Sequence, residues 1–247
     1  MVSPVGTLLR HWRGVRRVSQ LELALRAEVT PRHVSFVETG RSNPSREMVL
    51  TLARALDVPL RERNQMLLAA GFAPTYRQSA LDEPALAQVR AALERILSHH
   101  EPYPAVVMDR HWNVTQTNEA AASLFAWLLD GAEVGAPNVV RMMFGPLRPY
   151  VANFTDVGEA LIQRVHREAV GGVVDPATTD LLEEVLALPG IPAAWRVPDF
   201  ARGTLPIIPV EFAKGDDAVS YFSTVTTFGT PQDVTLQEIR LECFFPA

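Results

Sequence analysis

The sequence predicts an α+β protein in which a helical N-terminal region precedes a domain that combines a sheet with helices. Between residues 5 and 70, apolar side chains recur at the spacing of amphipathic helices. From residue 105 the pattern changes to a strand, a turn, a second strand and a helix. Three strand-like runs follow near the C-terminus, over residues 205–212, 219–228 and 239–245.

Local signals mark the ends of the N-terminal helices, which are expected over residues 8–15, 19–25, 30–40, 48–56 and 59–70. Ser19 is the expected N-cap of the second helix, and Glu22 completes a capping box. Thr30 followed by Pro31 starts the third helix, and Gly40 ends it. Later helices are expected over residues 86–97, 118–129, 154–170 and 178–188, and a hairpin turn at residues 215–217.

The composition is that of an ordinary soluble domain protein. The chain has 247 residues, of which 47% are hydrophobic and 21% charged, which excludes a wholly disordered chain. Cys243 is the single cysteine, which excludes an intrachain disulfide framework. No run approaches the roughly 18 apolar residues of a membrane span. The first residues show no secretory pattern, so the expected compartment is the cytoplasm, without membrane contact.

The net charge of −5 conceals an uneven distribution. Residues 1–77 carry a formal charge of +6, and the remaining residues carry −11. A basic N-terminal part on an acidic body indicates that only the N-terminal part meets a polyanion. Almost all the positive charge is arginine, which binds phosphate and guanine in a bidentate manner. A GC-rich genome would produce the same arginine bias.

Residues 20–38 fit a helix-turn-helix. Ala24 is the small residue required where the two helices cross, and Val34 and Val37 lie on the inner face of the second helix. The turn position that usually carries glycine is Glu28, and a non-glycine residue there costs on the order of 1 kcal/mol. A plain structural helix pair without DNA binding is the alternative interpretation.

The segments Ser19–Ala24, Thr30–Ser35 and Glu38–Arg41 resemble the phage-repressor-like helix-turn-helix family, of the Cro/C1 or xenobiotic-response-element type. The resemblance implies that Gln20 holds a phosphate and that Arg32 and Phe36 face bases, Arg32 on guanine and Phe36 on a thymine methyl. Packing inside the domain is the alternative for Phe36, and His33 fits either role. The expected DNA-binding residues are Ser19, Gln20, Thr30, Arg32, His33, Ser35, Phe36, Arg41, Asn43 and Arg46.

The C-terminal part carries a second resemblance. Residues 104–113 and 118–121 resemble the opening of a PAS-type sensor domain, in which a hairpin, an asparagine and a helix cover a ligand pocket. The expected organisation is a five-helix DNA-binding domain at 1–73, a linker with a connecting helix at 74–101, and a PAS-like domain at 102–247. The connecting helix or the PAS-like domain would mediate dimerisation.

A closer resemblance, which covers nearly the whole chain, is to the MmyB-like helix-turn-helix regulators, which have a PAS-like C-terminal domain. The residues that carry it are Arg46–Leu50, Pro59–Asn64, Glu101–Ala105, Asp109–Asn113, Leu147–Tyr150 and Gly229–Glu238. This resemblance implies a one-component transcriptional regulator whose PAS-like domain holds a fatty-acid-like molecule. The expected partners are an inverted-repeat operator in double-stranded DNA, a second copy of the chain and a small apolar ligand.

An apolar cluster over residues 139–144 is interrupted by Arg141, which must reach solvent or meet an anion such as a ligand carboxylate. Methionine is an adaptable liner for flexible apolar ligands. The alternative is an ordinary core with Arg141 pointing outward. Alternation along 220–228 leaves open which sheet face lies inside. The candidate ligand-binding residues are Asn118, Phe125, Arg141, Met142, Met143, Leu161, Phe222 and Thr224.

No motif indicates catalysis. His99 and His100 are adjacent on a helix and point in different directions, so they cannot easily share one metal ion. Gly171-Gly172 lacks the lysine of a phosphate-binding loop. We therefore expect a regulator rather than an enzyme, with no metal and no cofactor beyond a bound fatty acid or similar lipid. The alternatives are a C-terminal protein-interaction or dimerisation module, and an enzyme of unknown reaction.

Overall fold

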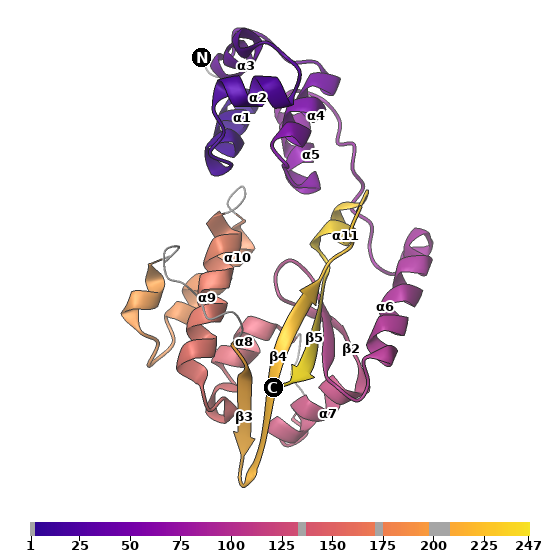
Figure 1. The fold of residues 1–247 in the computed structure, drawn as a ribbon, viewed down its shortest axis with the longest axis vertical. Helices are drawn as coiled ribbons and strands as arrows, with labels where there is room; N and C mark the ends of the chain where they lie inside the picture. Colours follow the sequence, from indigo (N-terminus) through magenta and orange to yellow (C-terminus); the bar gives the residue numbers. More distant parts are fainter. Residues whose placement is uncertain (1–2, 133–136, 171–174, 198–207) are drawn as a thin grey trace. The chain divides into compact units, whose positions relative to one another are not determined.

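The computed structural model describes residues 3–132, 137–170, 175–197 and 208–247 (Figure 1). These residues form two compact units. The first unit contains residues 3–79 together with residues 230–237, and the second contains the remaining described residues. The last part of the expected strand 205–212 is described, but its residues 205–207 lie outside the described ranges.

The five expected N-terminal helices are confirmed as α1 (Pro4–Val15), α2 (Gln20–Arg26), α3 (Pro31–Thr39), α4 (Arg46–Ala55) and α5 (Leu60–Ala69). The Ser19 hydroxyl accepts from the amide of Glu22 at 3.1 Å, and the Thr30 hydroxyl accepts from the amide of His33 at 3.2 Å. Gly40 ends α3 with φ 74°. The turn residue Glu28 has φ 55°, so it adopts the left-handed conformation that the motif requires.

The first unit also includes a segment from far along the chain, residues 230–237, which holds most of the short helix α11 (Val234–Glu238). Val234 is 1% exposed, and its amide donates to the carbonyl of Arg77 at 2.8 Å. The Asp233 carboxylate accepts from the amide of Ser79 at 3.2 Å. The Gln237 side chain accepts from the amide of Leu60, at the N-terminus of α5, at 2.6 Å.

The second unit is an antiparallel five-stranded sheet in the order β2-β1-β5-β4-β3. Its strands are β1 (Ala105–Met108), β2 (Val114–Thr117), β3 (Val210–Lys214), β4 (Asp217–Thr226) and β5 (Arg240–Pro246). Its helices are α6 (Ala87–His99), α7 (Glu119–Leu128), α8 (Val139–Phe144), α9 (Phe154–Val170) and α10 (Pro176–Leu186). Three short 3-10 helices join them: η1 (Pro84–Leu86), η2 (Arg148–Tyr150) and η3 (Ala193–Arg196).

The strand register decides which sheet face lies inside. Val106 of β1, Glu242 of β5 and Val225 of β4 are opposite one another, so their side chains share a face. Val106 belongs to the main hydrophobic core, to which α7, α8, α9 and α10 also contribute. The other face carries Phe245, whose ring lies 4.9 Å from that of His100 at the end of α6. The α+β fold class is confirmed, whereas α8 and α11 were not expected as helices.

Candidate DNA interface and ligand cavity

The first unit presents a helix-turn-helix made by α2, the turn at Glu28, and α3. Ala24 is 1% exposed, and Val34 and Val37 are fully buried, as the sequence predicts for the inner face. On the outer face, Arg32 is exposed, and Ser35 and Phe36 are partly exposed. In a helix-turn-helix, the N-terminal residues of the second helix enter the major groove. These three side chains lie in the N-terminal half of α3 and reach its surface.

The guanidinium groups of two arginines lie close to the ring of Phe36. The guanidinium carbon of Arg32 lies 5.0 Å from the centre of the Phe36 ring, and that of Arg41 lies 5.9 Å from it. A cation over an aromatic ring within about 6 Å is attracted by the ring quadrupole. The ring therefore restricts both arginines, and Phe36 has a contact that the sequence alone did not indicate.

Gln20 begins α2 and is fixed by a buried acid. Its amide nitrogen donates to the Glu38 carboxylate at 2.7 Å, and Glu38 is fully buried. Arg13 donates to both oxygens of that carboxylate, at 2.7 and 3.2 Å. One N–H of Gln20 therefore remains for a phosphate. Sequence reasoning missed the role of Glu38, although an acid beside Val37 on the inner helical face was a signal for a buried partner.

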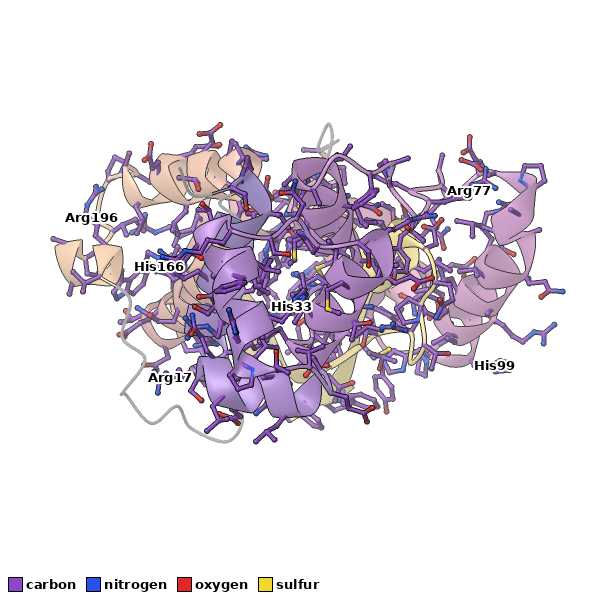
Figure 2. The ribbon with its side chains drawn as sticks, turned by 90° about the horizontal axis from the view of Figure 1, so that it is seen from above. Arg17, His33, Arg77, His99, His166 and Arg196 are labelled. Atoms are coloured by element: carbon purple, nitrogen blue, oxygen red, sulfur yellow. The ribbon has the colours of Figure 1, made fainter. Side chains whose placement is uncertain are left out.

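The other predicted DNA-binding residues surround this face. Ser19, Thr30, Arg41 and Asn43 are exposed, as is Arg46, whose guanidinium donates to the Thr75 hydroxyl at 2.9 Å. The His33 ring differs, because its Nε2 is buried and has no hydrogen-bond partner among the described residues. Figure 2 labels His33 among the helices of the first unit. The Nε2 atom of His33 is therefore not accessible from solvent, although the residue as a whole is partly exposed.

The second unit contains an apolar cavity of about 40 Å³ between the inner sheet face and helices α7 and α8. Its lining residues are Pro104, Val106, Leu124, Phe125, Val139, Met142, Met143, Leu147, Phe212, Glu242 and Phe244. A water molecule needs roughly 10–15 Å³ of such space. The cavity thus accepts a group of a few heavy atoms, and a longer chain requires the flexible methionines to move.

Three of the candidate ligand-binding residues, Phe125, Met142 and Met143, line this cavity. Leu161 packs against the surrounding core without lining the cavity. Phe222 and Thr224 were expected to line the ligand pocket, but the register places their side chains on the other sheet face from that of Glu242. Alternation alone gives two partly apolar faces on this strand, so the sequence could not choose between them.

Neither of the two residues expected at the polar end of a ligand lines the cavity. Arg141 is half exposed and makes a bidentate ion pair with Glu184, with its closest contact at 2.8 Å. Asn118 caps α7 by accepting from the amide of Ala121 at 3.0 Å, and it donates to the carbonyl of Tyr103 at 2.8 Å. The charged residue that does line the cavity is Glu242, which sequence reasoning missed. Its signal was a single acid in a mostly apolar strand that begins with Arg240.

The described residues contain no group of three or more histidine, cysteine or acidic side chains that could hold a metal ion. No helix among them is long and apolar enough to cross a membrane.

A helix-turn-helix unit and a sheet domain with an apolar cavity define the class of the protein, a DNA-binding transcription regulator that responds to a ligand. Residues 10–63 match the helix-turn-helix family model. Residues 89–247 match the family model of the MmyB-like transcription regulator ligand binding domain. The second match covers more than half of the chain, and the chain therefore belongs to the MmyB-like transcription regulators. No curated protein matches it.

Proposed function

We propose that the protein binds an inverted-repeat operator as a homodimer through α3, and that an apolar molecule in the cavity changes its affinity for that operator. The observation that carries the proposal is the outer face of α3, where the exposed cation of Arg32 is held over Phe36. An arginine fixed in this way at the start of a recognition helix suits bidentate binding to guanine.

A single helix-turn-helix reads only a few base pairs, which gives too little specificity among the competing sites of a genome. Two copies related by a twofold axis would read two half-sites about 34–36 Å apart along the DNA. This requirement for specificity supports the homodimer and the inverted repeat.

The ligand part of the proposal rests on the apolar lining and on the two methionines beside it. A fatty-acid-like chain is the occupant that we propose, with Met142 and Met143 moving aside to admit it. The ligand affects DNA binding only to the extent that it binds two states of the protein with different affinities.

A route for this effect runs along the chain itself. Residues 230–237 belong to the first unit, and β5, which carries Glu242 and Phe244 of the cavity lining, begins two residues after them. A displacement of β5 by a ligand would therefore act on the segment that holds Ser79 and the start of α5.

The experiment combines DNA binding with ligand extraction. The operator is first selected from random duplexes, and its dissociation constant is measured by fluorescence anisotropy at several salt concentrations. We expect affinity to fall steeply with salt, because phosphate contacts release counterions. Arg95→Ala on the exposed face of α6 is the matched control for Arg32→Ala.

The second arm uses organic-solvent extraction of the purified protein, followed by mass spectrometry and by titration of decanoate and 1-decanol. We expect an apolar molecule to co-purify, or one of the two probes to change operator affinity. If the protein binds the operator but neither an extracted molecule nor a probe changes its operator affinity, the protein is a regulator without this ligand control.

A further inference from the structure

The strand β4 extends beyond β3, the strand that pairs with one of its edges (Figure 1). β3 covers only the half of β4 between Asp217 and Tyr221. Before β3 the chain leaves the sheet, and the side chain of Asn153 donates to the carbonyl of Pro209 at 2.7 Å. The rest of β4, residues 222–226, pairs with β5 on one side and with no described strand on the other. We call this stretch the open edge of β4.

The open edge presents backbone groups that are available for hydrogen bonds. The amide of Ala247 donates to the carbonyl of Ser220 at 3.1 Å, so the even-numbered residues of β4 direct their backbone groups to β5. Ser223 and Val225 therefore direct their N–H and C=O groups to the other side. None of these four groups has a hydrogen-bond partner among the residues that the structure describes. Residues 223–226 are exposed, so the edge is accessible.

The side chains of the open edge do not protect it from pairing. Natural proteins block exposed strand edges with charged residues, proline or a β-bulge. Residues 222–226 are only phenylalanine, serine, threonine and valine, and their register with β5 is regular. The chain after residue 77 carries a formal charge of −11, so an uncharged stretch is where two such bodies approach without like-charge repulsion. A regular, uncharged and accessible edge thus indicates a strand that pairs with a second copy.

The same strand of a second copy fits the open edge when the two strands run antiparallel about a twofold axis at Thr224. Ser223 of each copy then lies opposite Val225 of the other, and their free groups form four backbone hydrogen bonds. The two Thr224 side chains face each other, which is a favourable cross-strand pair. β4 ends at Thr226, which lies opposite Phe222 of the other copy, so each chain leaves the pair before it reaches the stretch that β3 occupies.

We propose that the open edge of β4 joins two copies of the chain in a homodimer, with Thr224 of one copy opposite Thr224 of the other. The two five-stranded sheets then form one continuous sheet across the twofold axis. Because both copies use the same edge, assembly stops at two chains. This inference rests on the proposed function, which requires a homodimer, and it identifies the surface that forms that dimer.

The test uses the twofold symmetry, because the same residue of both copies meets at the axis. In Thr224→Lys two ammonium groups face each other, and in Thr224→Glu two carboxylates do. Sedimentation velocity of the full chain over a range of concentrations measures the Kd of the dimer. We expect each variant alone to raise this Kd at least about tenfold, because like charges lie directly opposite. An equimolar mixture should return to within about threefold of the wild-type Kd, because lysine then faces glutamate.

Thr117→Lys and Thr117→Glu are the matched controls, because Thr117 is an exposed threonine of β2, at the other end of the sheet. They introduce the same charges and should leave the Kd unchanged. Val225→Pro is a second disrupting variant, since it removes a free N–H near the axis without removing a hydrogen bond to β5. Circular dichroism melting establishes that the variants are folded, and Val225→Pro alone tests the inference if the Thr224 variants do not fold.

The outcomes separate this inference from the proposed function. A dimer that survives Thr224→Lys and Val225→Pro would overturn the pairing through β4 and leave a homodimer formed elsewhere. An equimolar mixture that stays as dissociated as the single variants would overturn the pairing at Thr224. A wild-type monomer in solution, with a footprint of one half-site on DNA, would overturn the proposed homodimer and with it this inference, and the open edge would then be available to a strand of another protein.

Discussion

Arg13 of α1 and Glu38 of α3 form a two-pronged ion pair inside the first unit, with Arg13 Nε donating to Oε1 at 2.7 Å and Nη2 donating to Oε2 at 3.2 Å. The same carboxylate accepts from Gln20 at the start of α2. One buried acid thus fixes three elements of the DNA-binding unit relative to one another.

Replacing Glu38 with alanine is therefore expected to destabilise the first unit by about 3 kcal/mol, at the lower end of the range for a broken buried pair. The value lies at that end because the Arg13 side chain is 21% exposed and regains some hydration. Urea unfolding measures the change. Glu22→Ala is the control, since its exposed pair with Arg26 is worth under about 1 kcal/mol. Equal losses in the two variants would contradict the buried role of Glu38.

The same pair predicts a pH dependence. Burial raises the pKa of the Glu38 carboxyl, but hydrogen bonds from Arg13 and Gln20 lower it by more, and the net pKa lies below its ordinary value. A depressed folded pKa stabilises the fold fully above the unfolded value of about 4.3, and this stabilisation is lost as the pH falls through the folded pKa. Unfolding of the wild type and Glu38→Gln at pH 7 and pH 3 should show a difference that shrinks in acid. A difference independent of pH would rule out this titration.

Arg32→Ala is expected to weaken operator binding by about 1–3 kcal/mol and to relax base choice at one position in each half-site. Fluorescence anisotropy on the selected operator and on base-substituted duplexes measures both effects. Equal losses on operator and random DNA would reassign Arg32 to a phosphate. Phe36→Ala should produce part of the same loss, because it removes the ring beneath the guanidinium.

If the protein is a homodimer, its sedimentation coefficient at working concentration should correspond to a particle of two chains. Its footprint on the operator should have two symmetric halves. The halves should be centred about one helical turn apart. A monomer in sedimentation together with a footprint of one half-site would refute the inverted-repeat arrangement.

Asp233→Ala should separate ligand binding from DNA binding. The substitution removes the acceptor of the buried Ser79 amide, which costs about 1–3 kcal/mol of stability. We expect decanol to bind as before but to lose its effect on operator affinity. Asp216→Ala, at the exposed turn between β3 and β4, is the control. An unchanged effect of decanol in Asp233→Ala would exclude the segment as the route.

The sequence predicted those elements whose signals are local. Ser19, Thr30 and Gly40 act within one helical turn, so the helix ends of the DNA-binding unit were found from spacing alone. Pairings between distant residues were beyond such reasoning. Arg141 pairs with Glu184, and Ser79 with Asp233, across long stretches of chain whose approach depends on the complete fold.

The cavity shows the same difference between features that the sequence predicts and features that depend on the complete fold. The adaptable side chains of Met142 and Met143 were recognisable from composition and lie in the lining. The inner face of β4 was not recognisable, because both faces of that strand carry aromatic residues and threonine or serine. Only pairing with β5 determines that Ser223 shares a sheet face with Phe244 and that Phe222 lies on the other face.

The inclusion of residues 230–237 in the first unit bears on how such regulators can exchange their DNA-binding heads. A single recombination breakpoint after residue 79 would transfer the five helices but leave behind Val234, Asp233 and Gln237. The recipient protein would then have to supply its own side chain for the site of Val234 and its own acceptors for Ser79 and Leu60. We therefore expect the DNA-binding domain to be inherited together with the matching segment 230–237. Hybrid regulators made with one breakpoint should be less stable than the parent proteins. A second graft that restores the matching segment should recover that stability.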